Sequence, residues 1–168
     1  MKKYKPYTGI GSRQTPPEIL ALMTELAKTL AKKGLTLRSG GADGADSAFE
    51  AGAGENKEIF LPWKGFNQNP SGLYTIPEKA FSLAGSVHPA WGRLSQGARK
   101  LHARNTQQAL GQNLDQPSIF LIFYAPEKNG TVQGGTATAV ALARKNGIPT
   151  HNLKTSKTLP PEWEELLP

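Results

Sequence analysis

The stretch RSGGADGADSAFEAGA, residues 38–53, decides the fold class. Two adjacent glycines, Gly40 and Gly41, end an apolar segment, and a run rich in small residues follows them. Glycine adopts positive φ angles without steric cost and so permits a sharp turn. The pattern predicts a strand over 35–40, a tight turn, and a helix over 44–53.

The same alternation of short apolar segments and helical patterns continues along the chain. Further strands are predicted over residues 7–11, 58–63, 118–124 and 148–153. Further helices are predicted over residues 15–34, 94–111 and 134–147. Strands that alternate with helices indicate an α/β sandwich with a mainly parallel sheet.

The first helix carries its own start and stop signals. Thr15 is placed to cap its N-terminus, with Pro16 at the first helical position and Glu18 completing a capping box. Gly34 is placed to end it. The helix predicted over 94–111 is polar.

The least regular part of the chain is residues 64–93, where Gly, Pro and Asn are frequent. We interpret it as an irregular insertion or lid over one end of the sheet, with a short helix at 76–85. The length of 168 residues fits one domain, so we assign 1–168 to a single domain.

The amino-acid composition excludes some kinds of functional site and favours some kinds of binding partner. The chain has no cysteine, which excludes disulfides and thiolate chemistry and favours a cytoplasmic protein. Its three histidines, His88, His102 and His151, are too widely spaced for a structural zinc site, so we expect no metal. No apolar run is long enough to cross a bilayer, and the N-terminus has no apolar signal core. The net charge of +7 favours anionic partners, although scattered basic pairs also serve solubility.

In parallel sheets, ligands lie at the carboxyl ends of the strands where the strand order reverses. The loops after 7–11, 35–39 and 118–124 should therefore border a common crevice. From the first two loops we expect the ligand-binding residues Gly11, Ser12, Arg13 and Ser39.

Two glycine turns occupy equivalent places in this scheme. Gly40–Gly41 precedes one helix, and Gly134–Gly135 with Thr136 precedes another. Free N–H groups and the positive end of a helix suit a phosphate, and Thr136 and Thr138 add hydroxyl donors. The alternative is that each pair makes a tight turn and nothing more. Neither turn is followed by the Gly-Lys-Ser/Thr of a P-loop.

Asp43 and Asp46 follow the first turn, where carboxylates would repel a phosphate. They suit ribose hydroxyls or a base amine instead. The alternative for Asp43 is an N-cap of the helix over 44–53.

A third cluster is ARKLHARN, residues 98–105, which places His102, Arg104 and Asn105 within one helical turn. Arginine forms bidentate contacts with phosphate, so we expect Arg104 near the phosphate of a ligand. The alternative is a solvated basic face, with His102 satisfied inside the protein.

These residues carry a family resemblance over nearly all of 7–153. GSR at 11–13, SGGADGADSAFEAG and GGTATAVALARKNGIPTHNL resemble blocks of the DprA/Smf proteins. LHARN followed by GGTATAVALA resembles the MHERK and PGGxGTxxE motifs of the LOG phosphoribohydrolases. Both belong to the SLOG superfamily, which implies a Rossmann-like three-layer sandwich. The whole pattern most resembles short single-domain DprA-like proteins of phage genomes, which implies the host cytoplasm.

One departure bears on activity. In the LOG pattern an arginine and a glutamate carry hydrolysis of the N-glycosidic bond, and these positions correspond to Arg104 and Ala141. A methyl group cannot supply the charge of a carboxylate. We therefore assign no catalytic residue and expect no release of base from nucleoside monophosphates.

The residues favour a binding protein for a nucleotide or nucleotide-derived signal molecule, sensing or sequestering it, with no cofactor. A second hypothesis is a DprA-like module that binds single-stranded DNA weakly and in a salt-dependent way. A third is a LOG-like hydrolase with a relocated carboxylate. The resemblance also implies a homo-oligomer.

Overall fold

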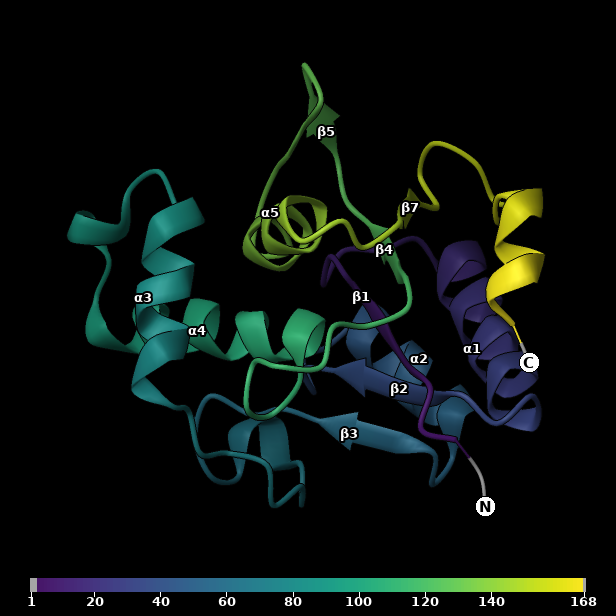
Figure 1. Ribbon diagram of the computed structural model, residues 1–168, viewed down its shortest axis with the longest axis horizontal. Helices are drawn as coiled ribbons and strands as arrows, with labels where there is room; N and C mark the ends of the chain where they lie inside the picture. Colours follow the sequence, from purple (N-terminus) through teal and green to yellow (C-terminus); the bar gives the residue numbers. More distant parts are fainter. Residues whose placement is uncertain (1–2, 168) are drawn as a thin grey trace.

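The computed structural model describes residues 3–167 and contains a parallel five-stranded sheet between layers of helices (Figure 1). The sheet order is β3-β2-β1-β4-β7, and every neighbouring pair is parallel. This arrangement confirms the α/β, Rossmann-like prediction. The sheet strands are β1 (Pro6–Gly11), β2 (Thr36–Ser39), β3 (Lys57–Ile59), β4 (Leu121–Tyr124) and β7 (Thr150–Asn152). The α-helices are α1 (Pro17–Lys32), α2 (Ala45–Ala53), α3 (Glu78–Val87), α4 (Gln96–Leu110) and α5 (Ala137–Lys145).

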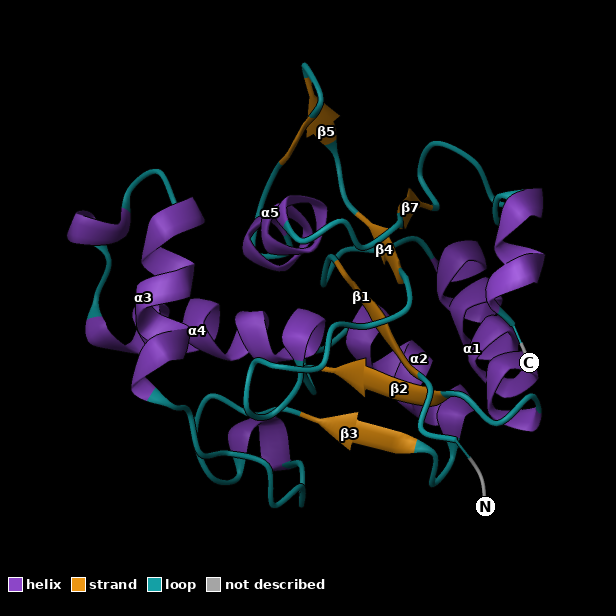
Figure 2. Ribbon diagram, viewed as in Figure 1, coloured by secondary structure: helices purple, strands orange, loops and turns teal. Residues whose placement is uncertain are grey.

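Helices cover both faces of the sheet (Figure 2). Met23 of α1 and Phe49 of α2 share one buried core with Ile122 of β4. Leu121 and Phe123, on either side of Ile122 in the same strand, belong to a second core with residues of α4 and α5. Burial on both faces explains why 118–124 is a continuous apolar run rather than an alternating one. No helix within residues 3–167 combines the length and apolarity needed to cross a membrane.

The start of α1 differs from the prediction. The helix begins at Pro17, Pro16 occupies the N-cap position, and no side chain caps it. The Thr15 hydroxyl instead donates to the Ser12 carbonyl at 2.7 Å, so the predicted capping box does not form. Thr15 thus stabilises the loop after β1. Gly34, with φ of +86°, follows the helix end as predicted.

The segment 64–93 contains more regular structure than predicted. It holds the 3-10 turns η1 (Phe66–Gln68) and η2 (Trp91–Arg93) as well as α3, which packs against α4 and α5. A hairpin of β5 (Glu127–Lys128) and β6 (Thr131–Val132) and a C-terminal 3-10 helix, η3 (Pro161–Leu166), were not predicted. The hairpin projects from the body of the protein, and η3 lies beside α1 (Figure 1).

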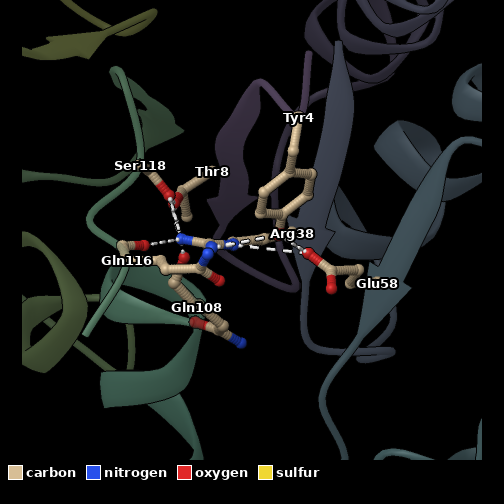
Figure 3. A network of polar contacts seen from close by, with 7 residues as sticks. All are labelled: Tyr4, Thr8, Arg38, Glu58, Gln108, Gln116 and Ser118. Carbon is tan, nitrogen blue, oxygen red and sulfur yellow. Dashed lines mark hydrogen bonds and ion pairs between the residues drawn. The ribbon is translucent and has the colours of Figure 1, made fainter. Parts of the chain in front are cut away.

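A fully buried arginine, Arg38, joins β2 to three other segments (Figure 3). Its Nη1 donates to the Gln116 carbonyl at 2.6 Å and to Ser118 Oγ at 3.2 Å. Its Nη2 donates to Tyr4 Oη at 3.0 Å, and Nε lies 3.4 Å from Glu58 Oε1. A buried guanidinium is tolerated only when its donors are paired, as they are here.

Replacing Arg38 by methionine should therefore destabilise the fold strongly. Arg38→Met leaves the Gln116 carbonyl and Ser118 without their donor and Glu58 with Tyr4 as its remaining partner, and we expect a loss of about 2–4 kcal/mol in the free energy of unfolding. Urea denaturation measures it. The matched control is Lys33→Met at an exposed position after α1, which should change stability by less than about 0.5 kcal/mol. Equal effects of the two substitutions would contradict a structural role for Arg38.

Candidate functional site

A cavity of about 550 Å³ lies at the carboxyl ends of β1 and β4. In the sheet, β2 lies on one side of β1 and β4 lies on the other, so the strand order reverses between β1 and β4. Its walls come from the loop after β1, the start of α2, one face of α4, and the segment that leads into α5.

Ten of the predicted site residues line this cavity: Gly11, Ser12, Arg13, Asp46, His102, Arg104, Asn105, Gly134, Gly135 and Thr136. Five do not: Ser39, Gly40, Gly41, Asp43 and Thr138. The cavity also takes in polar residues that sequence reasoning missed, namely Gln14, Gln108 and Gln133. Glutamine has no distinctive spacing, so no sequence signal could have singled these out.

The turn before α5 is open to the cavity. A Cβ built on Gly134 or Gly135 would meet no atom within 4 Å, and Gly134 has a φ of +87°. Asn105 Nδ2 donates to the Gly135 carbonyl at 3.0 Å and so holds the turn against α4. Thr136 occupies the N-cap position of α5 without a side-chain cap. Bare backbone at a helix N-terminus can hold an anionic group.

The turn after β2 is filled by the protein itself. A Cβ on Gly40 would lie 2.2 Å from Gln108 Nε2, 2.8 Å from Asp46 Oδ2 and 2.9 Å from Arg104 Nη1. The absence of a side chain at Gly40 therefore makes room for three polar side chains of this protein. The two glycine turns are alike in sequence, but side chains of the protein fill the space beside Gly40, whereas the space beside Gly134 and Gly135 is open.

The remaining residues of this turn have internal partners. Asp43 Oδ1 accepts a hydrogen bond from Asn67 Nδ2 at 3.0 Å, and the same Nδ2 donates to the Gly41 carbonyl. The N-cap of α2 is Gly44, without a side-chain cap, so the alternative of Asp43 as a cap is wrong. Ser39 Oγ donates to the Gly9 carbonyl at 2.6 Å.

Arg104 is buried, which excludes the solvated basic face considered for it. Its Nη1 donates to the Gly40 carbonyl and, at 2.9 Å, to the Phe60 carbonyl. Its Nε donates to Asn105 Oδ1 at 2.8 Å. Burial lowers the pKa of the guanidinium to about 10, against the opposing effect of Asp46, and leaves it charged at neutral pH. Arg104 thus lines the cavity while most of its donors are used inside the protein.

Asp46 is the buried carboxylate of the cavity wall. Its Oδ2 accepts a hydrogen bond from the Ala42 amide at 3.3 Å. Burial raises the pKa of Asp46 to about 6, although the charge of Arg104 and hydrogen bonds lower it.

His102 lines the cavity described above and also a second cavity that adjoins it. Its Nδ1 is 2.8 Å from Thr138 Oγ1, and its ring packs edge-on against that of His88, with 4.4 Å between the centroids. Burial, then the charges of His88 and Arg104, lower the pKa of His102 below its ordinary 6.5. The imidazole is therefore neutral at pH 7.

Arg13 is the exposed cation of the cavity. Within residues 3–167 its guanidinium forms neither a hydrogen bond nor an ion pair with another side chain. In the same part of the chain no group of three or more His, Asp or Glu side chains is placed to hold a metal ion. The site is thus equipped to bind an anion through Arg13 and the turn before α5.

The pKa of Asp46 predicts a pH dependence of stability. Between the ordinary value of 3.8 and the folded-state value of about 6, the folded protein binds the proton more tightly than the unfolded chain does. Stability from this group is therefore complete below about pH 4 and is lost as the pH rises through 6. The free energy of unfolding, relative to that of Asp46→Asn, should fall by up to about 3 kcal/mol from pH 4 to 7. A difference that is constant with pH in denaturant titrations would contradict this.

The two glycine turns should respond differently to alanine. Gly40→Ala forces a methyl group against Gln108 and should cost about 1–3 kcal/mol of stability. Gly135→Ala enters open space and should change the free energy of unfolding by less than about 0.5 kcal/mol. Thermal and urea denaturation of both variants measure this, and a stable Gly40→Ala protein would show that the crowding around Gly40 relaxes.

Comparison with known proteins identifies the fold. No family model and no curated protein matches the chain. Among solved structures, DNA processing protein A (DprA) from Helicobacter pylori, studied for its mode of binding single-stranded DNA, superposes with a TM-score of 0.58 at 19% identity. The match covers 88% of this chain and 63% of that one.

DprA from Streptococcus pneumoniae superposes with a TM-score of 0.51 at 14% identity, over 88% of this chain and 49% of that one. The chain therefore spans less than two thirds of the length of either structure. At these identities the likeness concerns the fold: this chain folds as DprA proteins do over most of its length.

Proposed function

We propose that the protein binds single-stranded DNA and that the first cavity holds one nucleotide of the strand. The observation that carries the proposal is the pairing of exposed Arg13 with the open Gly134–Gly135 turn on the wall of one cavity. A guanidinium and a helix N-terminus are two kinds of group that bind phosphate. The similar fold of the H. pylori protein, described as binding single-stranded DNA, supports the same partner here.

The size and polarity of the cavity fit a nucleotide. About 550 Å³ lies within the range of small-molecule sites. Gln14, Gln133 and Asp46 supply amide and carboxylate groups for a base or sugar. Arg104 keeps Gly40, α4 and the cavity wall in place rather than serving as the main phosphate ligand.

The same features also fit the second candidate, a free nucleotide-derived signal molecule, because a cavity of this volume holds one nucleotide without a strand. We do not propose hydrolysis, because Ala141 holds a methyl group at the position that the resemblance assigns to the glutamate of the LOG proteins. Assembly into a homo-oligomer stays a prediction, which light scattering tests.

Fluorescence anisotropy with a labelled thymidine oligonucleotide tests the proposal. We expect binding that weakens steeply between about 50 and 200 mM salt, because phosphate contacts release counterions. Arg13→Ala should weaken binding about tenfold or more, the effect of losing one charged hydrogen bond, and should reduce the salt slope by about 0.7.

Lys33→Ala is the matched control, since it removes the same charge from an exposed position after α1. An equal loss of affinity in both variants would mean diffuse attraction rather than binding at the cavity. Tight binding of a nucleoside monophosphate without binding of the oligonucleotide would favour the signal molecule instead.

A further inference from the structure

A second cavity of about 610 Å³ adjoins the first. Four residues line both: His102, Gln133, Gly134 and Gly135. The rest of its wall comes from the end of α3, the β5–β6 hairpin and the outer face of α5. The open glycine turn before α5 therefore separates two cavities, with no side chain of its own to block passage between them.

The lining of the second cavity includes two imidazole rings and several aliphatic side chains. The rings of His88 and His102 lie at 70° to each other, with centroids 4.4 Å apart. Val132 and Val140 are among the apolar residues that face them. Imidazole rings are among the side chains on which unstacked bases lie in single-stranded nucleic acid complexes.

Each of these rings keeps a nitrogen for a ligand. His88 Nδ1 accepts from the Ala90 amide at 3.0 Å, and His102 Nδ1 contacts Thr138 Oγ1 at 2.8 Å. Both Nε2 atoms are left, within residues 3–167, without a hydrogen bond to the protein. The edge of a nucleobase carries donors and acceptors that match such nitrogens.

No carboxylate in the lining of the second cavity would repel an anionic strand. Its lining contains no Asp or Glu, and its charged member is Arg144, which pairs with Glu127 at 2.9 Å. The first cavity, in contrast, carries the carboxylate of Asp46 in its wall.

We propose that the second cavity binds the base of the nucleotide adjacent to the one in the first cavity, so that the strand crosses the Gly134–Gly135 turn. The phosphate between the two nucleotides would then lie against the N-terminus of α5, where backbone N–H groups face it. This inference rests on the proposed binding of single-stranded DNA and names the route of the strand.

Ala141 allows a sharp test, because it is an exposed residue of α5 that lines only the second cavity. Ala141→Glu introduces a carboxylate where we place the neighbouring base and its backbone. The matched control is Ala51→Glu, an exposed alanine of α2 on the opposite face of the sheet. Both variants change the net charge equally and place glutamate inside a helix.

We expect Ala141→Glu to weaken binding of a thymidine oligonucleotide at least tenfold, with Ala51→Glu close to the unmodified protein. Affinity for thymidine monophosphate should be the same in all three, because one nucleotide occupies only the first cavity. His88→Ala should weaken oligonucleotide binding, and His88→Phe should recover most of it by restoring a ring. Circular dichroism verifies that each variant is folded.

Equal oligonucleotide affinity in Ala141→Glu and Ala51→Glu would overturn the inference and route the strand elsewhere, leaving binding at the first cavity intact. An equal loss for the monophosphate and the oligonucleotide in Ala141→Glu would also overturn it, because the cavities would then form one site. Absence of oligonucleotide binding by the unmodified protein would overturn both this inference and the proposed function.

Discussion

The buried guanidinium of Arg104 is the interaction on which the candidate site depends. It joins α4 to the turn after β2 and to the end of β3 through the carbonyls of Gly40 and Phe60. A charge removed from water requires such partners, since an unpaired buried charge costs several kcal/mol. The requirement ties α4 to the carboxyl ends of the strands, and it favours glycine at position 40, where a Cβ would lie 2.2 Å from Gln108 Nε2 and 2.9 Å from Arg104 Nη1.

Because Arg104 bonds to the backbone near Gly40, one side of the cavity is filled by side chains and the other side is open. On the side of β2, Arg104, Asp46 and Gln108 fill the space over Gly40, and the charges of Arg104 and Asp46 attract each other. On the side of α5, a Cβ built on Gly134 or Gly135 would meet no atom within 4 Å, so this side of the turn is open. The α5 turn and Arg13 are thus the parts of the cavity that our proposal assigns to an anion, while the buried arginine bonds to the backbone behind them.

The alternation of apolar segments and helical patterns was sufficient to predict the α/β class. A strand of a parallel sheet is buried on both faces, and this burial requires a continuous apolar run such as 118–124. The buried state of Arg104 could not be predicted. Its partners are backbone carbonyls 64 and 44 residues away in sequence. Every residue type has a backbone carbonyl, so the sequence does not indicate which ones accept these hydrogen bonds. The same reason applies to Thr15, whose hydroxyl donates to a carbonyl instead of capping α1. The β5–β6 hairpin did have a signal, since Asn129-Gly130 is a typical two-residue turn and both residues have positive φ.

A single carboxylate, that of Asp46, lines the first cavity. Cleavage of an N-glycosidic bond in the LOG manner needs a carboxylate that stabilises charge beside the sugar. Of the residues that line the first cavity, Asp46 alone carries a carboxylate, and it accepts a hydrogen bond from Ala42 and lies under the influence of Arg104. Position 141, to which the resemblance assigns the LOG glutamate, holds a methyl group and lines the second cavity. The strand binding that we propose therefore relies on the open turn before α5 and on exposed Arg13, and it requires no residue that acts on a glycosidic bond.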